Sequence, residues 1–173
     1  MPTKTSAKKQ TRPASPGDAI ALLTNDHKEV HALFQTYGKL CKSGADSQER
    51  QPVAEQICLL LSVHAAIEEE IFYPAAREAD VDAALLDEAD VEHASCKELI
   101  AQIEAMDADD ELYDAKVTVL GEYIDHHVKE EQDEMFPQCR ESAMDLKAIG
   151  AALAERKAEL MAEMTEGMEE TSA

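Results

Sequence analysis

The chain has 173 residues, enough for one domain with short extensions and a core that needs no disulfide staples. It carries 37 acidic residues against 16 basic ones, which gives a formal charge of −21. Nucleic acids and anionic membranes repel such a chain, so we expect neither as a partner and look for a ligand that is neutral, cationic or buried.

Cysteine usage and the absence of long apolar stretches suggest where the protein works. The cysteines form no CxxC pair and fit reduced, half-buried thiols, with Cys58 and Cys96 as small core residues. Residues 1–17 have no apolar h-region, and no later stretch approaches the roughly 18 uncharged apolar residues of a membrane span. We therefore expect a cytoplasmic protein without a secretion signal.

The first part of the chain predicts an arm and then a helix. Residues 1–17 are rich in Lys, Thr, Ser and Pro, which is typical of a disordered arm. Asp18 can cap a helix that runs to about Cys41. Its apolar residues are spaced three and four apart only when position 27, a histidine, is counted among them.

Three further apolar stripes follow, and each also contains one histidine. The second stripe is Val53, Ile57, Leu60, His64, Ile67 and Ile71. The third is Leu86, Ala89, His93, Cys96, Ile100 and Ile103. The fourth is Tyr113, Val117, Leu120, Ile124, His127 and Glu131. Short links near 42–47, 77–84 and 107–111 then predict an all-α protein, an antiparallel up-down-up-down four-helix bundle spanning residues 18–141.

Residues 142–173 predict one more amphipathic helix, with Leu146, Ile149, Leu153 and Leu160 on its apolar face. It ends in an acidic tail. Two interpretations stay open: an appended helix that frays at its end, or a helix that makes a homodimer contact.

The histidines within the four apolar stripes indicate metal binding. A buried imidazole without partners costs about 1–3 kcal/mol per unsatisfied group, and a metal ion supplies a partner for one of its nitrogens. His64 and His127 are each followed four residues later by a glutamate, Glu68 and Glu131. Residues four apart share one helix face, so each HxxxE pair can reach one centre.

The two HxxxE pairs belong to an internal repeat. Residues 64–74 read HAAIEEEIFYP and residues 127–137 read HVKEEQDEMFP, with His, Glu and Pro at equal offsets. The repeat predicts two half-sites that meet in the core. Four imidazoles and two carboxylates suit a pair of borderline metals, with iron the natural candidate, and exceed what a four-coordinate structural zinc needs.

The order of these motifs resembles the hemerythrin-like, or HHE cation-binding, domain family. The motifs are Asp26-His27, His64 with Glu68 and Pro74, Glu92-His93, and His127 with Glu131 and Pro137. The resemblance implies two non-haem iron ions joined by an oxo or hydroxo bridge. It assigns one iron to His27 and His64 and the other to His93 and His127. Glu68 and Glu131 would bridge them.

The chain departs from the oxygen-carrying members of that family at two places. They have a further histidine one turn after the third-helix histidine, where this chain has Lys97, and an aspartate five after the last histidine, where it has Glu131 at four. His31 is a candidate for the missing ligand, although its flank position favours the surface. His126 is expected to point outward.

The remaining polar and aromatic residues near the motifs have simpler interpretations. Glu69, Glu70, Glu130 and Asp133 fit a solvated face, with a minor chance of hydrogen bonds to the ligand histidines. The aromatic residues are expected mainly to pack in the core: Phe34, Phe72, Tyr73, Tyr123 and Phe136.

The leading functional hypothesis is a diiron protein that binds dioxygen, nitric oxide or peroxide for sensing, scavenging or carriage. Whether the protein is an enzyme stays open, because loss of one nitrogen ligand also favours a diiron peroxidase or catalase-like activity. Iron storage or delivery is a third hypothesis, and a metal-free interaction bundle is the simplest one.

Overall fold

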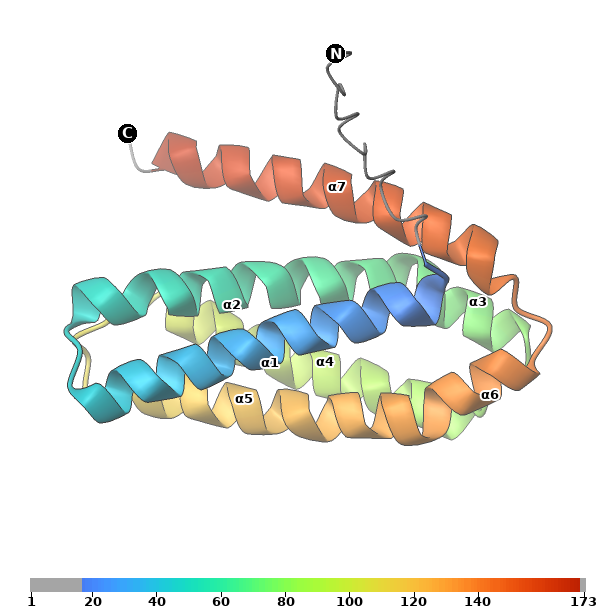
Figure 1. Ribbon diagram of the computed structural model, residues 1–173, viewed down its shortest axis with the longest axis horizontal. Coiled ribbons are helices and arrows are strands. Elements are labelled where there is room, and N and C mark those ends of the chain that lie inside the picture. Colours follow the sequence, from blue (N-terminus) through green and yellow to red (C-terminus); the bar gives the residue numbers. More distant parts are fainter. Residues whose placement is uncertain (1–16, 172–173) are drawn as a thin grey trace, which may run out of the picture.

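The computed structural model describes residues 17–171, in which all regular structure is helical (Figure 1). Its elements are α1 (Ala19–Ser43), α2 (Ser47–Ile67), η1 (Glu68–Phe72), α3 (Tyr73–Glu78), α4 (Ala83–Glu104), α5 (Tyr113–Glu130), η2 (Glu131–Met135), α6 (Phe136–Glu141) and α7 (Leu146–Thr171). The elements η1 and η2 are π-helices. None of the helices described has the length and apolar character that a membrane span requires. The arm predicted for residues 1–17 lies outside the described residues, except for Gly17.

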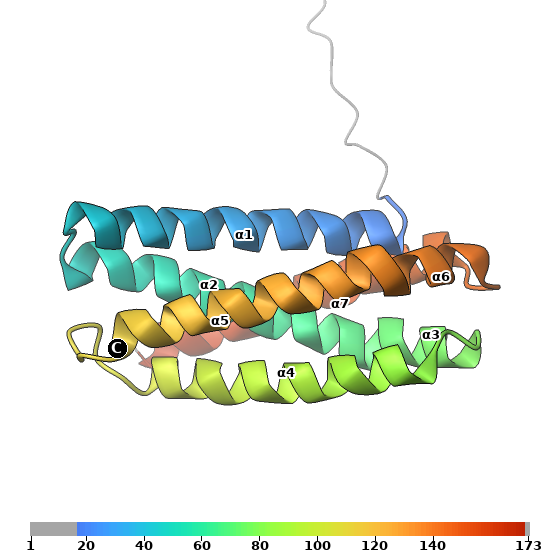
Figure 2. The ribbon, with the colours of Figure 1, turned by 90° about the horizontal axis from the view of Figure 1, so that it is seen from below.

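The helices form an antiparallel four-helix bundle, as predicted. The segments α2, η1 and α3 follow one another without a break, as do α5, η2 and α6, so each set makes one long rod (Figure 2). The rod containing α2 packs against α1 and α4, and α5 packs against α1 and α4. Each helix therefore has its sequence neighbours beside it.

Side-chain caps set several of the helix starts. Asp18 accepts a hydrogen bond from the backbone N–H of Ala21 at 2.8 Å and caps α1, as predicted. Asp46 and Asp82 do the same for α2 and α4. Helix α1 ends at Gly44, whose φ of 75° is the left-handed conformation in which glycine carries no penalty.

The core consists of two apolar clusters, one towards each end of the bundle. One includes Leu23, Ile67, Phe72, Leu86 and Phe136. The other includes Val30, Ile57, Ile100, Val117 and Leu120. Between them lies a layer of buried polar side chains, so the sequence gives up apolar packing at this level of the bundle.

Helix α7 is the predicted extra C-terminal helix, and it lies along the side formed by α1 and α2 (Figure 1). Its Leu153 is fully buried in the first cluster, and Leu146, Ile149 and Leu160 pack against that cluster. Gly150 lets α7 approach closely, because a Cβ there would lie 2.7 Å from the backbone nitrogen of Ala19. The apolar face of α7 is thus used within the chain, and a homodimer through this helix stays a prediction.

Candidate metal centre

The buried polar layer brings together the six side chains that the sequence predicted as metal ligands. None of the six is more than 6% exposed. They are His27 on α1, His64 on α2, Glu68 at the start of η1, His93 on α4, His127 on α5, and Glu131 at the start of η2. Helices α1 and α4 and both long rods therefore contribute to one site.

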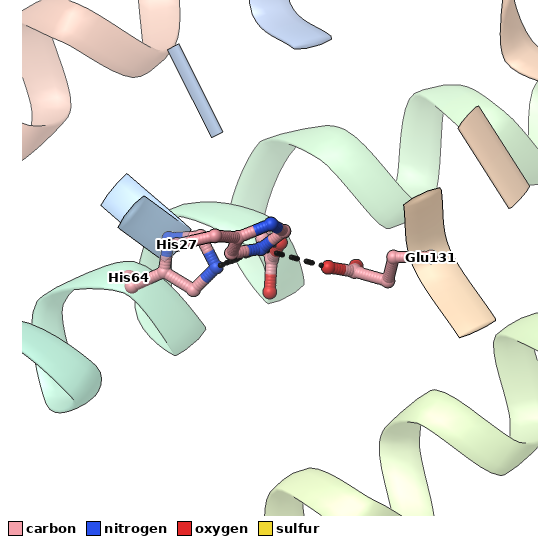
Figure 3. Close-up of side chains that lie close together, drawn as sticks. His27, His64 and Glu131 are labelled. Atoms are coloured by element: carbon pink, nitrogen blue, oxygen red, sulfur yellow. Dashed lines mark hydrogen bonds and ion pairs between the residues drawn. The ribbon is translucent and has the colours of Figure 1, made fainter. Parts of the chain in front are cut away.

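The first group of donor atoms joins α1 and α2 to the two π-helices. Nε2 of His27 lies 3.1 Å from Nε2 of His64. Nε2 of His64 lies 3.1 Å from Oε1 of Glu68. Nε2 of His27 lies 3.1 Å from Oε2 of Glu131, which points toward the two histidines (Figure 3). These residues offer four donor atoms within 4.8 Å of one another, close enough to surround one cation.

The second group joins α4 and α5 to the same carboxylates. Nε2 of His93 lies 3.1 Å from Nε2 of His127 and 3.2 Å from Oε2 of Glu68. Nε2 of His127 lies 3.6 Å from Oε2 of Glu131. Glu68 thus presents one oxygen to each group, and Glu131 contacts both. This arrangement matches two cations that share two carboxylates.

A cation pair also satisfies polar atoms that the protein leaves without hydrogen bonds. Oε1 of Glu68 and Oε2 of Glu131 are buried and have no hydrogen-bond partner, and a cation pair would satisfy both. Nδ1 of His27 also has no partner, but it lies on the other side of the ring from Nε2, so a metal bound at Nε2 would not satisfy it. The two carboxylate oxygens lie close to imidazole nitrogens without forming a hydrogen bond of good geometry. Unsatisfied buried groups are costly and rare, so the donor set fits a pair of bound metal ions.

The two π-helices explain how a tyrosine enters this layer. In each, a backbone N–H bonds to the carbonyl five residues earlier, from Tyr73 to Glu68 and from Phe136 to Glu131. Residues five apart on an α-helix are about 140° apart around the axis, but the wider π turn brings them to nearly the same face. Pro74 and Pro137 follow directly, and proline cannot donate to the preceding turn.

Tyr73 is buried in the core, as expected of a packing residue, and its hydroxyl is in addition part of the site, which was not predicted. Its hydroxyl donates to Oε1 of Glu131 at 2.8 Å and lies 3.2 Å from Oε2 of Glu68. It is also 3.3 Å from Nε2 of both His93 and His127. Phe72 is fully buried in the core, as expected of a packing residue, and Ile71 of the predicted stripe is partly buried against the same cluster.

The repeat places phenylalanine where the first half has tyrosine. The ring of Phe136 stacks on His27 with centroids 5.9 Å apart and carries no oxygen. The tyrosine oxygen consequently lies in the group that contains His93 and His127. That is the group in which Lys97 stands where oxygen carriers have another histidine.

Carboxylates from neighbouring helices hold the far side of three ligand histidines. Oδ2 of Asp26 lies 3.2 Å from Nδ1 of His64, and Oε2 of Glu92 lies 2.6 Å from Nδ1 of His127. Each acidic residue directly precedes a ligand histidine in sequence and orients the histidine of the adjacent helix. Such contacts fix the tautomer and leave Nε2 free to bind a metal.

The third contact comes from Glu69, which was expected mainly on a solvated face. Its Oε1 lies 2.9 Å from Nδ1 of His93, and its Oε2 accepts from Lys97 at 2.5 Å. Lys97 therefore reaches His93 through Glu69. Glu69 therefore makes the hydrogen bond to a predicted ligand histidine that was the less favoured expectation for these acidic residues. Glu70 instead contacts Arg156.

The buried acids and imidazoles shift one another's pKa values. Burial lowers the pKa of His64, but the charge of Glu68 and the contact with Asp26 outweigh it and raise the pKa to about 10. Burial, then the charge of Glu131 and the Glu92 contact, act the same way on His127, whose pKa rises to about 9. Burial and the two nearby carboxylates hold the pKa of Tyr73 well above its usual range. A bound cation would replace the protons that now screen these carboxylates.

The other candidate residues lie outside the site. The side chain of His31 is 55% exposed and faces Asp125, so it is not the missing ligand. His126 is 66% exposed and points outward, as predicted. Cys58 and Cys96 are buried free thiols whose pKa burial raises to about 12 and about 11, so they stay protonated at neutral pH.

A small cavity of about 30 Å³ is lined in part by the four histidines. A single water needs roughly 10–15 Å³ on this measure, so the cavity has room for a ligand of two or three atoms. Its remaining wall has three polar members, Asp26, Ser62 and Lys97, and is otherwise apolar: Val30, Leu61, Ala65, Cys96, Ile100, Ile124 and Val128.

Comparison with known proteins agrees with a helical bundle that binds cations. The sequence matches the family model described as the hemerythrin HHE cation binding domain over residues 18–139. The crystal structure of a hemerythrin HHE cation binding domain-containing protein from Mycobacterium kansasii aligns with 88% of this chain and 93% of its own, with a TM-score of 0.73 and 20% identity. That identity supports a common fold and nothing finer. A search of curated proteins found no match.

Proposed function

Because this chain belongs to the hemerythrin HHE cation-binding domain family, we propose that it is a non-haem diiron protein that binds dioxygen, nitric oxide or peroxide. His27 and His64 would hold one iron, His93 and His127 the other, and Glu68 and Glu131 would bridge them. Imidazole and carboxylate donors suit iron among the borderline metals. When bound, the iron pair supplies redox chemistry and coordination positions for a small ligand.

The observation that carries this proposal is the small apolar cavity beside the four histidines. Its size admits a diatomic molecule or peroxide. Its apolar wall limits the access of water and protons to a bound ligand. Since none of the six ligands is more than 6% exposed, the site is also poorly suited to the rapid ligand exchange that iron storage requires.

Tyr73 would complete the ligand set of the second iron. Its oxygen lies 3.3 Å from Nε2 of both His93 and His127. It therefore stands on the side of the pair that lacks a third histidine. Binding to iron would stabilise the phenolate, whose formation burial and the neighbouring carboxylates otherwise oppose.

The same residue favours a second candidate, a peroxide-consuming diiron enzyme. Tyr73 places a hydroxyl 2.8 Å from Glu131 inside the site, where the pair can hold or move a proton. Breaking the O–O bond of peroxide requires a proton to be delivered to the leaving oxygen, which a hydroxyl placed in the site could supply and later regain. The choice between carriage and turnover therefore depends on what this hydroxyl does.

One set of reactions tests the proposal. The protein would be loaded with iron and reduced under anaerobic conditions, then mixed with dioxygen, nitric oxide or hydrogen peroxide and followed by visible absorption and an oxygen electrode. A stable coloured adduct with dioxygen or nitric oxide supports binding, and sustained oxygen release from peroxide supports the enzyme. An iron-loaded protein that responds to none of the three would contradict both.

A further inference from the structure

Helix α7 reaches the metal centre from outside the bundle through one side chain. Nζ of Lys157 donates to Oδ1 of Asp26 at 2.6 Å, and the other oxygen of Asp26 lies 3.2 Å from Nδ1 of His64. Asp26 is only 5% exposed. Lys157 lies beyond residue 139, where the family match ends. A segment outside the matched domain thus contacts the residue that orients a ligand.

Lys157 solves an electrostatic problem that Asp26 creates. A carboxylate buried without a partner of opposite charge is destabilised, because burial removes its water shell. The ammonium group supplies the opposite charge at hydrogen-bond distance. Without it, the carboxylate gains by turning towards water, and Nδ1 of His64 loses its acceptor.

We propose that Lys157 is a positioning residue of the metal centre, which holds Asp26 against His64 so that Nε2 of His64 faces the first ion. This inference rests on the proposed diiron function. It makes α7 part of the centre's construction, in addition to its packing on the bundle.

The second half of the site contains a similar chain of contacts but in a wetter place. There Lys97 donates to Glu69, which contacts His93. The side chains of Lys97 and Glu69 are 51% and 30% exposed, against 27% and 7% for Lys157 and Asp26. Solvent screens the charge of Lys97 more than that of Lys157, so we expect loss of Lys157 to change the iron affinity more than loss of Lys97.

The test measures ferrous iron affinity by competition with a chelator under anaerobic conditions. Loss of a residue that orients a metal ligand typically costs 10–100-fold in metal affinity, so we expect Lys157→Met to weaken binding about 10-fold. Lys157→Arg keeps the positive charge and should retain most of the wild-type iron affinity. In an Asp26→Asn background, Lys157→Met should cause no further loss, because the lysine acts through Asp26.

Two variants on α7 serve as matched controls, and both should bind iron like the wild type. Lys147→Met removes the same charge from an exposed position. Arg156→Met removes an ion pair between α7 and Glu70 without touching Asp26. Melting curves of the iron-free variants show whether each one folds.

Three results would overturn the inference. Lys157→Met could match the controls, it could still cost 10-fold in the Asp26→Asn background, or it could raise the affinity because the lysine only repels the ion. If instead the wild type itself bound no iron, the proposed diiron function would fail, and this inference with it.

Discussion

Glu68 and Glu131 are the residues at which a single change should affect the site most. Each contacts donor atoms of both groups, whereas each histidine belongs to one. Both carboxylates are essentially fully buried, and two anions at short range in a low-dielectric interior need a cation between them. The bridging role therefore follows from position and from charge.

We predict that the Glu68→Ala and Glu131→Ala variants lose most of their bound iron, because removing a bridging carboxylate weakens the binding of both ions. His126→Ala should keep the wild-type iron content, since His126 points outward. Iron and protein are quantified on the purified variants. Equal loss in the His126 and His127 variants would show that the ligand register on α5 is wrong.

Tyr73 gives a second prediction at this scale. If its oxygen binds the second iron, the ferric protein should show a phenolate-to-iron charge-transfer band that Tyr73→Phe lacks. In the iron-free protein, Tyr73→Phe should also lower the free energy of unfolding by about 1.5–3 kcal/mol, because it removes the hydrogen bond from the Tyr73 hydroxyl to the carboxylate of Glu131. The measurements are a visible spectrum and a denaturant titration, and an unchanged spectrum would remove Tyr73 from the ligand set.

The six ligand candidates could be found from the sequence, but Tyr73 could not. Histidines within the apolar stripes and HxxxE pairs are read directly from helical spacing. The role of Tyr73 depends on one wide helical turn, which changes the face that a residue occupies and leaves no mark in hydrophobic periodicity. The repeated glutamate six residues before a proline was the available signal, and it appears at Glu68 and Glu131.

At the scale of elements, the π-helices and α7 are what distinguish this bundle from a plain one. Each π-helix begins at one of the two carboxylates proposed to bridge the irons, consistent with the frequent placement of such turns at functional sites. The apolar stripe predicted α7 correctly as an extra helix. Its partner could not be predicted, because an apolar face specifies burial without specifying the surface that covers it.

Gly150 tests the docking of α7. Gly150→Ala places a Cβ within 2.9 Å of three backbone atoms at the start of α1, which cannot move aside as side chains do. We expect a loss of about 1–3 kcal/mol in the free energy of unfolding. Gly38→Ala is the control, since nothing lies within 4 Å of its new Cβ, and it should be neutral or slightly stabilising. Equal stability in both variants would contradict the close docking of α7.

At the scale of the whole molecule, the bundle exchanges apolar packing for a buried charged layer. Iron should therefore stabilise the fold, by about 4 kcal/mol when free metal exceeds its dissociation constant a thousandfold. The formal charge of −21 adds a general repulsion that two bound cations reduce. The composition and the spacing of the apolar residues predicted this architecture, because both patterns extend through all the helices of the bundle.

The effect of iron on melting temperature should grow with pH. In the iron-free protein the pKa values of His64 and His127 are raised to about 10 and about 9. Their contribution to stability is complete below the ordinary pKa of about 6.5 and is lost as pH rises through the raised values. Iron binds the deprotonated imidazoles, so its affinity rises over the same range. Calorimetry between pH 6.5 and 8.5 should show a widening difference, and a shrinking one would contradict the ligand assignment.

The most direct test of the central claim is the iron stoichiometry of the folded protein, measured by anaerobic titration of the iron-free chain with ferrous iron. The two groups of donors share their carboxylates, so we predict two ions per chain, bound at nearly the same free iron concentration. Saturation at one ion per chain, or displacement of iron by a single zinc, would contradict the paired-iron centre.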